Sequence, residues 1–384
     1  MRSLTYSDEQ EEFRSVVRRF LDDHSPPTEV RRWMEDDAGF DPAVWRRLCD
    51  DLGVGGLHLP EAYGGQAFSA VEQSIVLQEM GRALLCSPYF GSIVLAATAI
   101  AHGATDAAKK ERLPDLANGS QRAALAFAEQ TSAWSPHDVA MTATADGADF
   151  RLDGSKRFVV DGHSADGLVV VARVPGSTGT DGLSLFWVAG DADGLERRRL
   201  ESLDPSRKLA QLDFAGVRAA ALGAPGTAAG ALDHTLDLAC IALAHEMVGG
   251  AERVLETTVE YAKTRVQFGR PIGSFQAIKH KCADMLVDVE LAKSTAIHAA
   301  AAAAEGAEDL PLLAALTKAL VSDAYRTAAT ESIQIHGGIG FTWEHDCHLY
   351  FKRARSAAIL LGDATHHRER MARLLELGAS KASA

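Results

Sequence analysis

A short segment rich in glycine and proline most constrains the fold, because it interrupts an otherwise helical pattern across the C-terminal half of the chain. It reads RVQFGRPIGSFQ and spans residues 265–276. Gly269 and Gly273 permit tight turns, and Pro271 cannot continue a helix because it lacks a backbone N–H. Long helical patterns flank the segment on both sides. We therefore expect a corner between two helices, and the simplest interpretation makes its two phenylalanines plugs that fill this corner.

The hydrophobic pattern divides the 384 residues into three blocks, and the chain is longer than a single core usually supports. Helical spacing begins after Ser7, a predicted N-cap, and gives way near residue 120 to short β-type runs separated by Asp-Gly turns. Helical patterns resume near Gly230, and the Gly249-Gly250 pair indicates a close helix contact. We predict an α+β multidomain protein, with an α-helical domain (1–120), a β-barrel or sandwich domain (121–228) and an α-helical bundle (229–384).

Composition excludes several classes of protein. The formal net charge of −13 argues against a nucleic-acid partner, because neutralising phosphates requires a basic surface. The five cysteines are scattered without a CxxC pair, so neither a disulfide framework nor a zinc site is predicted. The amino terminus lacks an apolar signal region, and no apolar run approaches the roughly 18 residues that span a bilayer. We expect a cytoplasmic protein with buried thiols and no membrane span.

Two motifs resemble the most recognisable segments of the acyl-CoA dehydrogenase family. The first is Arg-x-x-Phe-Gly-x-x-Ile-x-x-x-Gln, starting at Arg265 and followed by Ala-Asp-Met at 283–285, and the second is QIHGGIGF at 334–341. A third, weaker match is PEAYGG at 60–65. The resemblance covers nearly the whole chain. It implies the three-domain fold of that family, bound FAD, an acyl-CoA substrate, an electron-transfer flavoprotein as electron acceptor, and a tetramer.

The resemblance also assigns residues to the cofactor. It places the Arg265 guanidinium on the pyrophosphate of an FAD held mainly by a neighbouring subunit, which suits a planar, always charged group; without the resemblance, Arg265 would be an ordinary surface ion-pair residue. It places backbone amides of the glycine turn against the adenosine diphosphate portion. The predicted contacts in these motifs are Arg265, Gln267, Phe268, Gln276, Gln334, Ile335, Gly337 and Gly338.

The match weakens in the β block, where the family binds the flavin ring. Two threonines that bond the ring edge in the family correspond to Ala128 and Val160, and a tryptophan corresponds to Phe158. Backbone amides there can still donate hydrogen bonds. Losing two side-chain bonds worth roughly 0.5–1.5 kcal/mol each weakens binding by one or two orders of magnitude at most. We therefore keep all three residues as predicted FAD contacts.

The catalytic base departs further from the family. The usual glutamate position is Leu361, and the alternative position used by some relatives is Ala239, followed by Cys240 in place of an arginine. Neither leucine nor alanine can accept a proton. Two carboxylates are candidate replacements. Glu246 lies two helical turns from Ala239, and Asp363 lies two residues from Leu361, where it also suits an N-cap of the next helix. Asp363 is the stronger candidate for a base.

The histidine-rich tetrapeptide His345-Asp346-Cys347-His348 contains metal-ligand residue types. Histidines at this spacing beside aromatic residues are more often packing and hydrogen-bonding groups, and the resembled family uses no metal. No metal site is predicted. His336, in the glycine turn, is at most a weak cofactor contact.

Three functions follow from the resemblance. The first is FAD-dependent α,β-desaturation of an acyl-CoA thioester, within lipid or steroid catabolism. The second is a subunit without a base, which completes the FAD site of a homologous partner in a heterotetramer, as in similar actinobacterial steroid-degrading proteins. The third is a flavin-dependent oxidase or monooxygenase on the same fold. The sequence does not identify the acyl group, and fold analogy cannot choose among the three.

Overall fold

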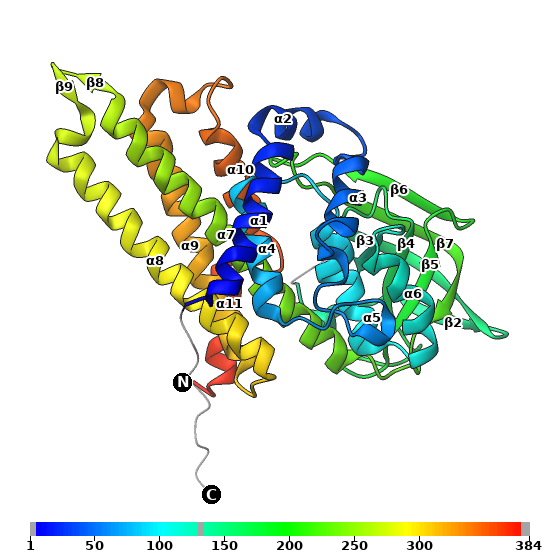
Figure 1. Ribbon diagram of the computed structural model, residues 1–384. Helices are drawn as coiled ribbons and strands as arrows, with labels where there is room; N and C mark the ends of the chain where they lie inside the picture. The colour runs from blue at the N-terminus through cyan, green and yellow to red at the C-terminus, as the bar shows by residue number, and fades with distance from the viewer. Residues whose placement is uncertain (1–4, 130–133, 378–384) are drawn as a thin grey trace, which may run out of the picture. The chain divides into compact units, whose positions relative to one another are not determined.

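The computed structural model describes residues 5–129 and 134–377 (Figure 1). These residues form two compact units. The helical unit comprises Met1–Pro27, Ser74–Leu85 and Cys240–Ala384, and the mixed unit comprises Thr28–Gln73 and Cys86–Ala239. The predicted fold class is confirmed, because helices precede a β-sheet and a further set of long helices follows it. The exact domain boundaries near residues 120 and 228 stay a prediction.

Helix capping explains where the first helix begins. The Ser7 side chain accepts from the Gln10 N–H at 3.3 Å, and the Gln10 side chain accepts from the Ser7 N–H at 2.9 Å, which confirms the predicted N-cap. A short helix near residue 30 was not predicted. The N-terminal helices are α1 (Asp8–His24), α2 (Pro27–Glu35), α3 (Pro42–Asp50), α4 (Ala70–Arg82), the π-helix η3 (Phe90–Ala97), α5 (Thr98–Gly103) and α6 (Asp106–Ala117).

The sheet of the mixed unit closes on itself, as the predicted barrel requires. Its seven strands are β1 (Ala123–Ala126), β2 (Thr142–Asp146), β3 (Asp149–Val160), β4 (Gly167–Arg173), β5 (Leu183–Ala189), β6 (Leu195–Leu200) and β7 (Leu209–Ala221). They pair in the order β1-β4-β2-β3-β7-β5, β5 returns to pair with β4, and β6 pairs with β7. Fully buried residues such as Leu152, Val170 and Leu212 fill the interior. Alternating apolar residues therefore face one core.

Long helices dominate the C-terminal part of the chain. They are α7 (Ala229–Thr264), α8 (Gln276–Glu305), α9 (Leu310–His336), α10 (Cys347–Ile359) and α11 (Ala364–Leu374), with the 3₁₀ turn η6 (Gly337–Phe341) after α9. Figure 1 shows α7, α8 and α9 as long helices in green, yellow and orange. The predicted corner between α7 and α8 is a hairpin of β8 (Val266–Gln267) and β9 (Arg270–Pro271), followed by the 3₁₀ turn η5 (Ile272–Ser274). No helix among the described residues is long and apolar enough to cross a bilayer.

Two glycines bring α4 and α7 into backbone contact within the helical unit. A Cβ added at Gly81 of α4 would lie 1.9 Å from the Glu246 carbonyl oxygen, and one added at Gly249 of α7 would lie 1.7 Å from the Gln78 carbonyl oxygen. Neither space admits any side chain. On another face of α7, a Cβ at Gly250 would lie 2.4 Å from Tyr325 Oη. The predicted close packing at the glycine pair is confirmed.

Candidate functional site

The ends of α7 and α9 meet in the helical unit. The Tyr261 ring stacks on the His336 ring with centroids 4.2 Å apart, and Tyr261 Oη donates to the His336 carbonyl at 3.3 Å. Arg265 follows Tyr261 by about one helical turn, and residues 334–338 surround His336. The two sequence motifs therefore lie at the same end of this unit. We call the exposed residues Arg265, Phe268, Gln334, Gly337 and Gly338 the cofactor corner.

The first motif presents mostly exposed side chains, and the Phe268 ring contacts only the edge-on ring of Phe275, with centroids 6.1 Å apart, among the ring contacts of the described residues. Arg265 is exposed, and no carboxylate among the described residues lies within ion-pair distance of it. Phe268 has a left-handed backbone (φ 54°) at the hairpin tip, and its side chain is 92% exposed. The interpretation of Phe268 as a plug of the corner is therefore wrong in this chain. Gln276 is exposed, whereas the Gln267 amide donates to the neighbouring Val266 carbonyl at 2.8 Å.

The second motif presents open backbone. Helix α9 ends where Gly337 adopts φ 63°, and a Cβ at Gly337 or Gly338 would have no atom within 4 Å. Gln334 is exposed, but the Ile335 side chain is buried at 6% exposure, so only its backbone can face a ligand. An exposed guanidinium and an unobstructed glycine turn at one end of a helical unit fit a diphosphate. The cofactor corner is thus compatible with FAD.

The predicted flavin-ring contacts in the mixed unit are less open. Ala128 and Val160 are 6% and 3% exposed, and the Ala128 carbonyl accepts from the Arg157 N–H at 2.9 Å. Phe158 has φ 55° and its ring lies 6.0 Å from the ring of Trp134. The intervening residues 130–133 of the aligned family segment lie outside the described residues. The assignment of these three residues to FAD stays a prediction.

A partly buried ion pair in the mixed unit was missed from the sequence. Lys156 is fully buried, and its Nζ donates to Glu129 at 2.6 Å and to the Phe127 carbonyl at 3.2 Å. Burial lowers the pKa of Lys156 to about 8, and the Glu129 carboxylate opposes that shift. Glu129 also accepts from the backbone N–H groups of Ala140 and Met141. Glu129, which follows β1, therefore links that strand to β3 through Lys156 and to the residues just before β2 through Ala140 and Met141.

The positions of the catalytic base are filled by core residues. Leu361 is 4% exposed with φ 61°, and Ala239 is fully buried. The buried Glu246 accepts from Arg353 Nη1 at 2.7 Å, so this carboxylate already has a cationic partner. Asp363 Oδ1 accepts from the His366 N–H at 2.8 Å and caps α11, as the sequence suggested. The role of Asp363 as a base stays a prediction.

Two buried donors hold the segment 360–363, which we call the base loop. Lys318 Nζ donates to the Gly362 carbonyl at 3.0 Å, and His367 Nε2 lies 3.0 Å from the Leu361 carbonyl, placed to donate to it. Burial lowers the pKa of Lys318 to about 8 and that of His367 to about 3. Cys240, at the position of the family arginine, has its Sγ 4.0 Å from His367 Nε2. Sequence motifs gave no sign of these contacts, because Lys318 and Cys240 lie far from the base loop in the chain, and the bond from His367 back to Leu361 depends on how the loop folds.

Comparison with known proteins agrees with this arrangement. The chain matches the sequence profiles of the N-terminal, middle and C-terminal domains of acyl-CoA dehydrogenase over residues 7–120, 124–216 and 229–376. It is 37% identical to acyl-CoA dehydrogenase IpdE2 of Mycobacterium tuberculosis, over 93% of this chain and 94% of that protein. The chain belongs to the acyl-CoA dehydrogenase family.

Two solved structures illustrate the fold that this chain shares with known proteins. A variant of the Tcur3481-Tcur3483 steroid ACAD is 32% identical with a TM-score of 0.87, covering 97% of this chain and 99% of that chain. The ChsE4-ChsE5 complex from Mycobacterium tuberculosis is 28% identical with a TM-score of 0.87, covering 98% of this chain and 99% of that chain.

Proposed function

We propose that this chain is one subunit of a FAD-dependent acyl-CoA dehydrogenase, in which a homologous partner subunit supplies the catalytic base. The observation that carries the proposal is the buried Leu361 at the position of the family glutamate. Desaturation removes a proton from the α-carbon of the thioester, and neither Leu361 nor Ala239 can accept one. The open cofactor corner supports retention of FAD binding despite the loss of the base.

The residues of this chain then bind and orient the cofactor. Arg265 places a positive charge and a donor fork against the pyrophosphate, and Gln334 adds an amide at the same end of the unit. The open space beside Gly337 and Gly338 allows the adenosine diphosphate portion to approach the backbone closely, although the Gly337 N–H is already bonded to the Gln334 and Ile333 carbonyls. FAD, when bound, supplies the acceptor for the hydride that leaves the β-carbon. Electron-transfer flavoprotein is the proposed acceptor of the electrons that follow.

The relatives suggest the class of substrate. A structure to which this chain is 32% identical carries the name steroid ACAD. We propose a steroid-derived acyl-CoA thioester as substrate, with a place in steroid or lipid catabolism. The paired names of that structure and of the ChsE4-ChsE5 complex support a heterotetramer over a homotetramer.

Co-expression tests the assembly. The chain is produced alone and together with a homologous acyl-CoA dehydrogenase chain that retains the family glutamate, and purified material is examined for mass, flavin content and bleaching by a panel of acyl-CoA thioesters. We expect a heterotetramer with fewer flavins than chains, and bleaching only in that complex. A stable homotetramer with one flavin per chain that is bleached by an acyl-CoA would contradict the proposal.

A matched pair of variants tests whether Asp363 is a base in this chain. Asp363→Asn keeps an N-cap for α11 but cannot accept a proton, whereas Asp363→Ala removes both functions. We expect Asp363→Asn to leave the activity of the complex unchanged. Loss of bleaching in Asp363→Asn with unchanged flavin content would instead assign the base to this chain. Rapid oxygen consumption by the reduced complex would favour the oxidase function.

A further inference from the structure

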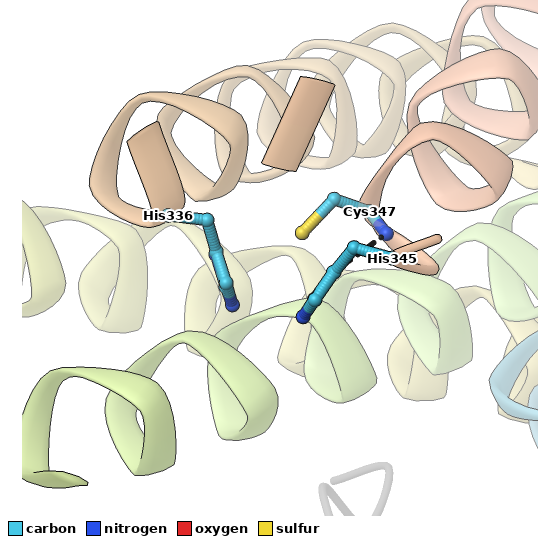
Figure 2. A group of neighbouring side chains, drawn as sticks. All are labelled: His336, His345 and Cys347. Carbon is cyan, nitrogen blue, oxygen red and sulfur yellow. Dashed lines mark hydrogen bonds between the residues drawn. The ribbon is translucent and has the colours of Figure 1, made fainter. Parts of the chain in front are cut away.

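Three potential metal ligands converge where α9 ends and α10 begins. His336 is the last residue of α9, His345 precedes α10, and Cys347 is its first residue. One ligand atom from each lies within 4.8 Å of the other two. Figure 2 shows both imidazole rings extending to the same side, with the Cys347 sulfur directed toward His336. The sequence interpretation overlooked this group because it paired His345 with His348, and His336 lies outside that tetrapeptide.

The hydrogen bond of His336 determines which ring nitrogen can coordinate a metal ion. Its Nδ1 lies 2.8 Å from the Ser332 carbonyl, which can only accept, so Nδ1 carries the proton and Nε2 bears a lone pair. A metal-bound histidine commonly donates its other ring N–H to a carbonyl in this way. Stacking against Tyr261 further restricts the ring. His336 is therefore oriented before any ion arrives.

The other two ligands are coupled by a short loop. The Cys347 N–H donates to His345 Nδ1 at 3.2 Å, and the rings of His336 and His345 have centroids 4.5 Å apart. Coordination through His345 Nε2 moves its proton to Nδ1 and ends that long hydrogen bond. Cys347 Sγ is buried and lies 3.5 Å from Ser332 Oγ, so the thiol has a polar neighbour within the cluster.

A cavity adjoins the cluster. It has a volume of about 320 Å³ and is lined by all three residues together with Glu260, Tyr261 and Asp346. A tetrahedral zinc ion with Zn–N near 2.0–2.1 Å and Zn–S near 2.3 Å needs ligand atoms about 3.3–3.6 Å apart. A shortening of roughly 1 Å, through rotation of the His345 and Cys347 side chains toward the fixed His336, would meet that requirement. The cavity leaves room for a water molecule in the fourth position.

We propose that His336, His345 and Cys347 bind one Zn²⁺ ion, with water from the cavity as the fourth ligand. Two imidazoles and one thiolate form a donor set that zinc favours, and the thiol loses its proton when the ion binds. The ion would connect the end of α9 to the start of α10, across η6 and its two exposed glycines. Its role is to hold this turn, without a part in hydride transfer.

Cobalt substitution tests the site directly. The full chain is stripped with a chelator, dialysed and titrated with Co²⁺, and difference spectra against the untitrated protein cancel any flavin. We expect visible bands of tetrahedral cobalt and a thiolate-to-cobalt charge-transfer band at one equivalent. Cys347→Ser should abolish the charge-transfer band, whereas Cys282→Ser, which changes a half-buried cysteine elsewhere in the helical unit, should keep it.

Zinc affinity and melting temperature complete the test, because a buried variant can fail to fold. Competition with a chromophoric chelator should give one Zn²⁺ per chain, and the half-buried His345→Ala should lose more than about 100-fold in affinity, beyond the range for losing only an outer partner. Zn²⁺ should raise the melting temperature of the wild type but not of His345→Ala. Absence of a charge-transfer band, or equal zinc affinity in wild type and His345→Ala, would overturn the proposal.

Discussion

The cofactor corner and the base loop belong to the same helical unit, yet they differ in whether their polar groups are exposed or hydrogen-bonded within the chain. At the corner, the Arg265 side chain has no ion-pair partner among the described residues, and the space beside Gly337 and Gly338 is open, although the Gly337 N–H already donates to the Gln334 and Ile333 carbonyls. At the base loop, the carbonyls of Leu361 and Gly362 are bonded to buried side chains. The cofactor corner thus leaves the Arg265 side chain exposed, whereas the base loop, which lacks the family glutamate, is enclosed by core residues. Under the proposed function, cofactor binding and proton transfer are therefore separable in this fold.

The largest expected effect comes from the buried pair of Glu246 and Arg353, which both lie in the interior of the helical unit. Glu246→Ala leaves the guanidinium buried without its carboxylate, so we expect a loss of about 3–5 kcal/mol in the free energy of unfolding, measured by urea denaturation. Glu260→Ala is the control, because its pair with Lys263 is exposed. Similar small changes in both variants would show that the interior does not depend on this pair.

Alkaline pH probes the donor beneath the base loop. Burial lowers the pKa of Lys318 from 10.5 to about 8. Between these values the unfolded chain holds a proton that the folded chain has lost, so the contribution of Lys318 to stability rises with pH, by up to roughly 3 kcal/mol. The difference in unfolding free energy between wild type and Lys318→Met should therefore grow in favour of the wild type from pH 7.5 to 10. Parallel pH profiles would contradict the burial of a titrating lysine.

The exposed corner is probed by Arg265→Ala. Loss of a charged donor pair at a diphosphate, worth about 1.5–3 kcal/mol, should weaken FAD binding by roughly 10- to 100-fold while the unfolding free energy of the flavin-free chain hardly changes. Flavin affinity is measured by titration of the flavin-free complex. Lys263→Ala, two residues earlier and paired with Glu260, is the matched control. An equal affinity in the two variants would remove Arg265 from the cofactor site.

The smallest expected effects on stability are those of alanine substitutions at Gly337 and Gly338, which should differ from each other. Gly337 has φ 63°, so Gly337→Ala should lower the unfolding free energy by about 1 kcal/mol. No positive φ is found at Gly338 and its surroundings are empty, so Gly338→Ala should leave unfolding within about 0.5 kcal/mol of wild type. Its FAD affinity should nonetheless fall several-fold, because the new methyl group occupies the path of close backbone approach. Unchanged affinity would place the cofactor elsewhere.

Sequence patterns predicted the elements whose causes are local. The cap at Ser7 and the close packing at Gly249 follow from residue type and spacing. Strand β6 was missed because LERRRL lacks an apolar alternation, and its pairing with β7 supplies what the pattern does not. Helix α10 was missed because its arginines and aromatics obscure a single apolar face.

The candidate site shows the same division. Arg265 and the glycine turn could be located from motifs, and their exposure agrees with a binding role. The bond from Lys318 to Gly362 joins residues 44 positions apart, and the bond that places Glu246 joins residues 107 apart. Such contacts depend on tertiary packing, which no local pattern encodes. The exposure of Phe268 was missed for the same reason, since a glycine corner alone does not determine which way its side chains point.

The crossing of α4 and α7 at Gly81 and Gly249 has a consequence for how this chain can change over generations. With main chain lying directly on main chain, neither helix can slip along the other by one residue without a collision between a methyl group and a carbonyl oxygen. The absence of a Cβ atom at Gly81 and at Gly249 therefore fixes the register of α4 against α7. A substitution elsewhere, such as one at Leu361, does not alter this contact between the two helices.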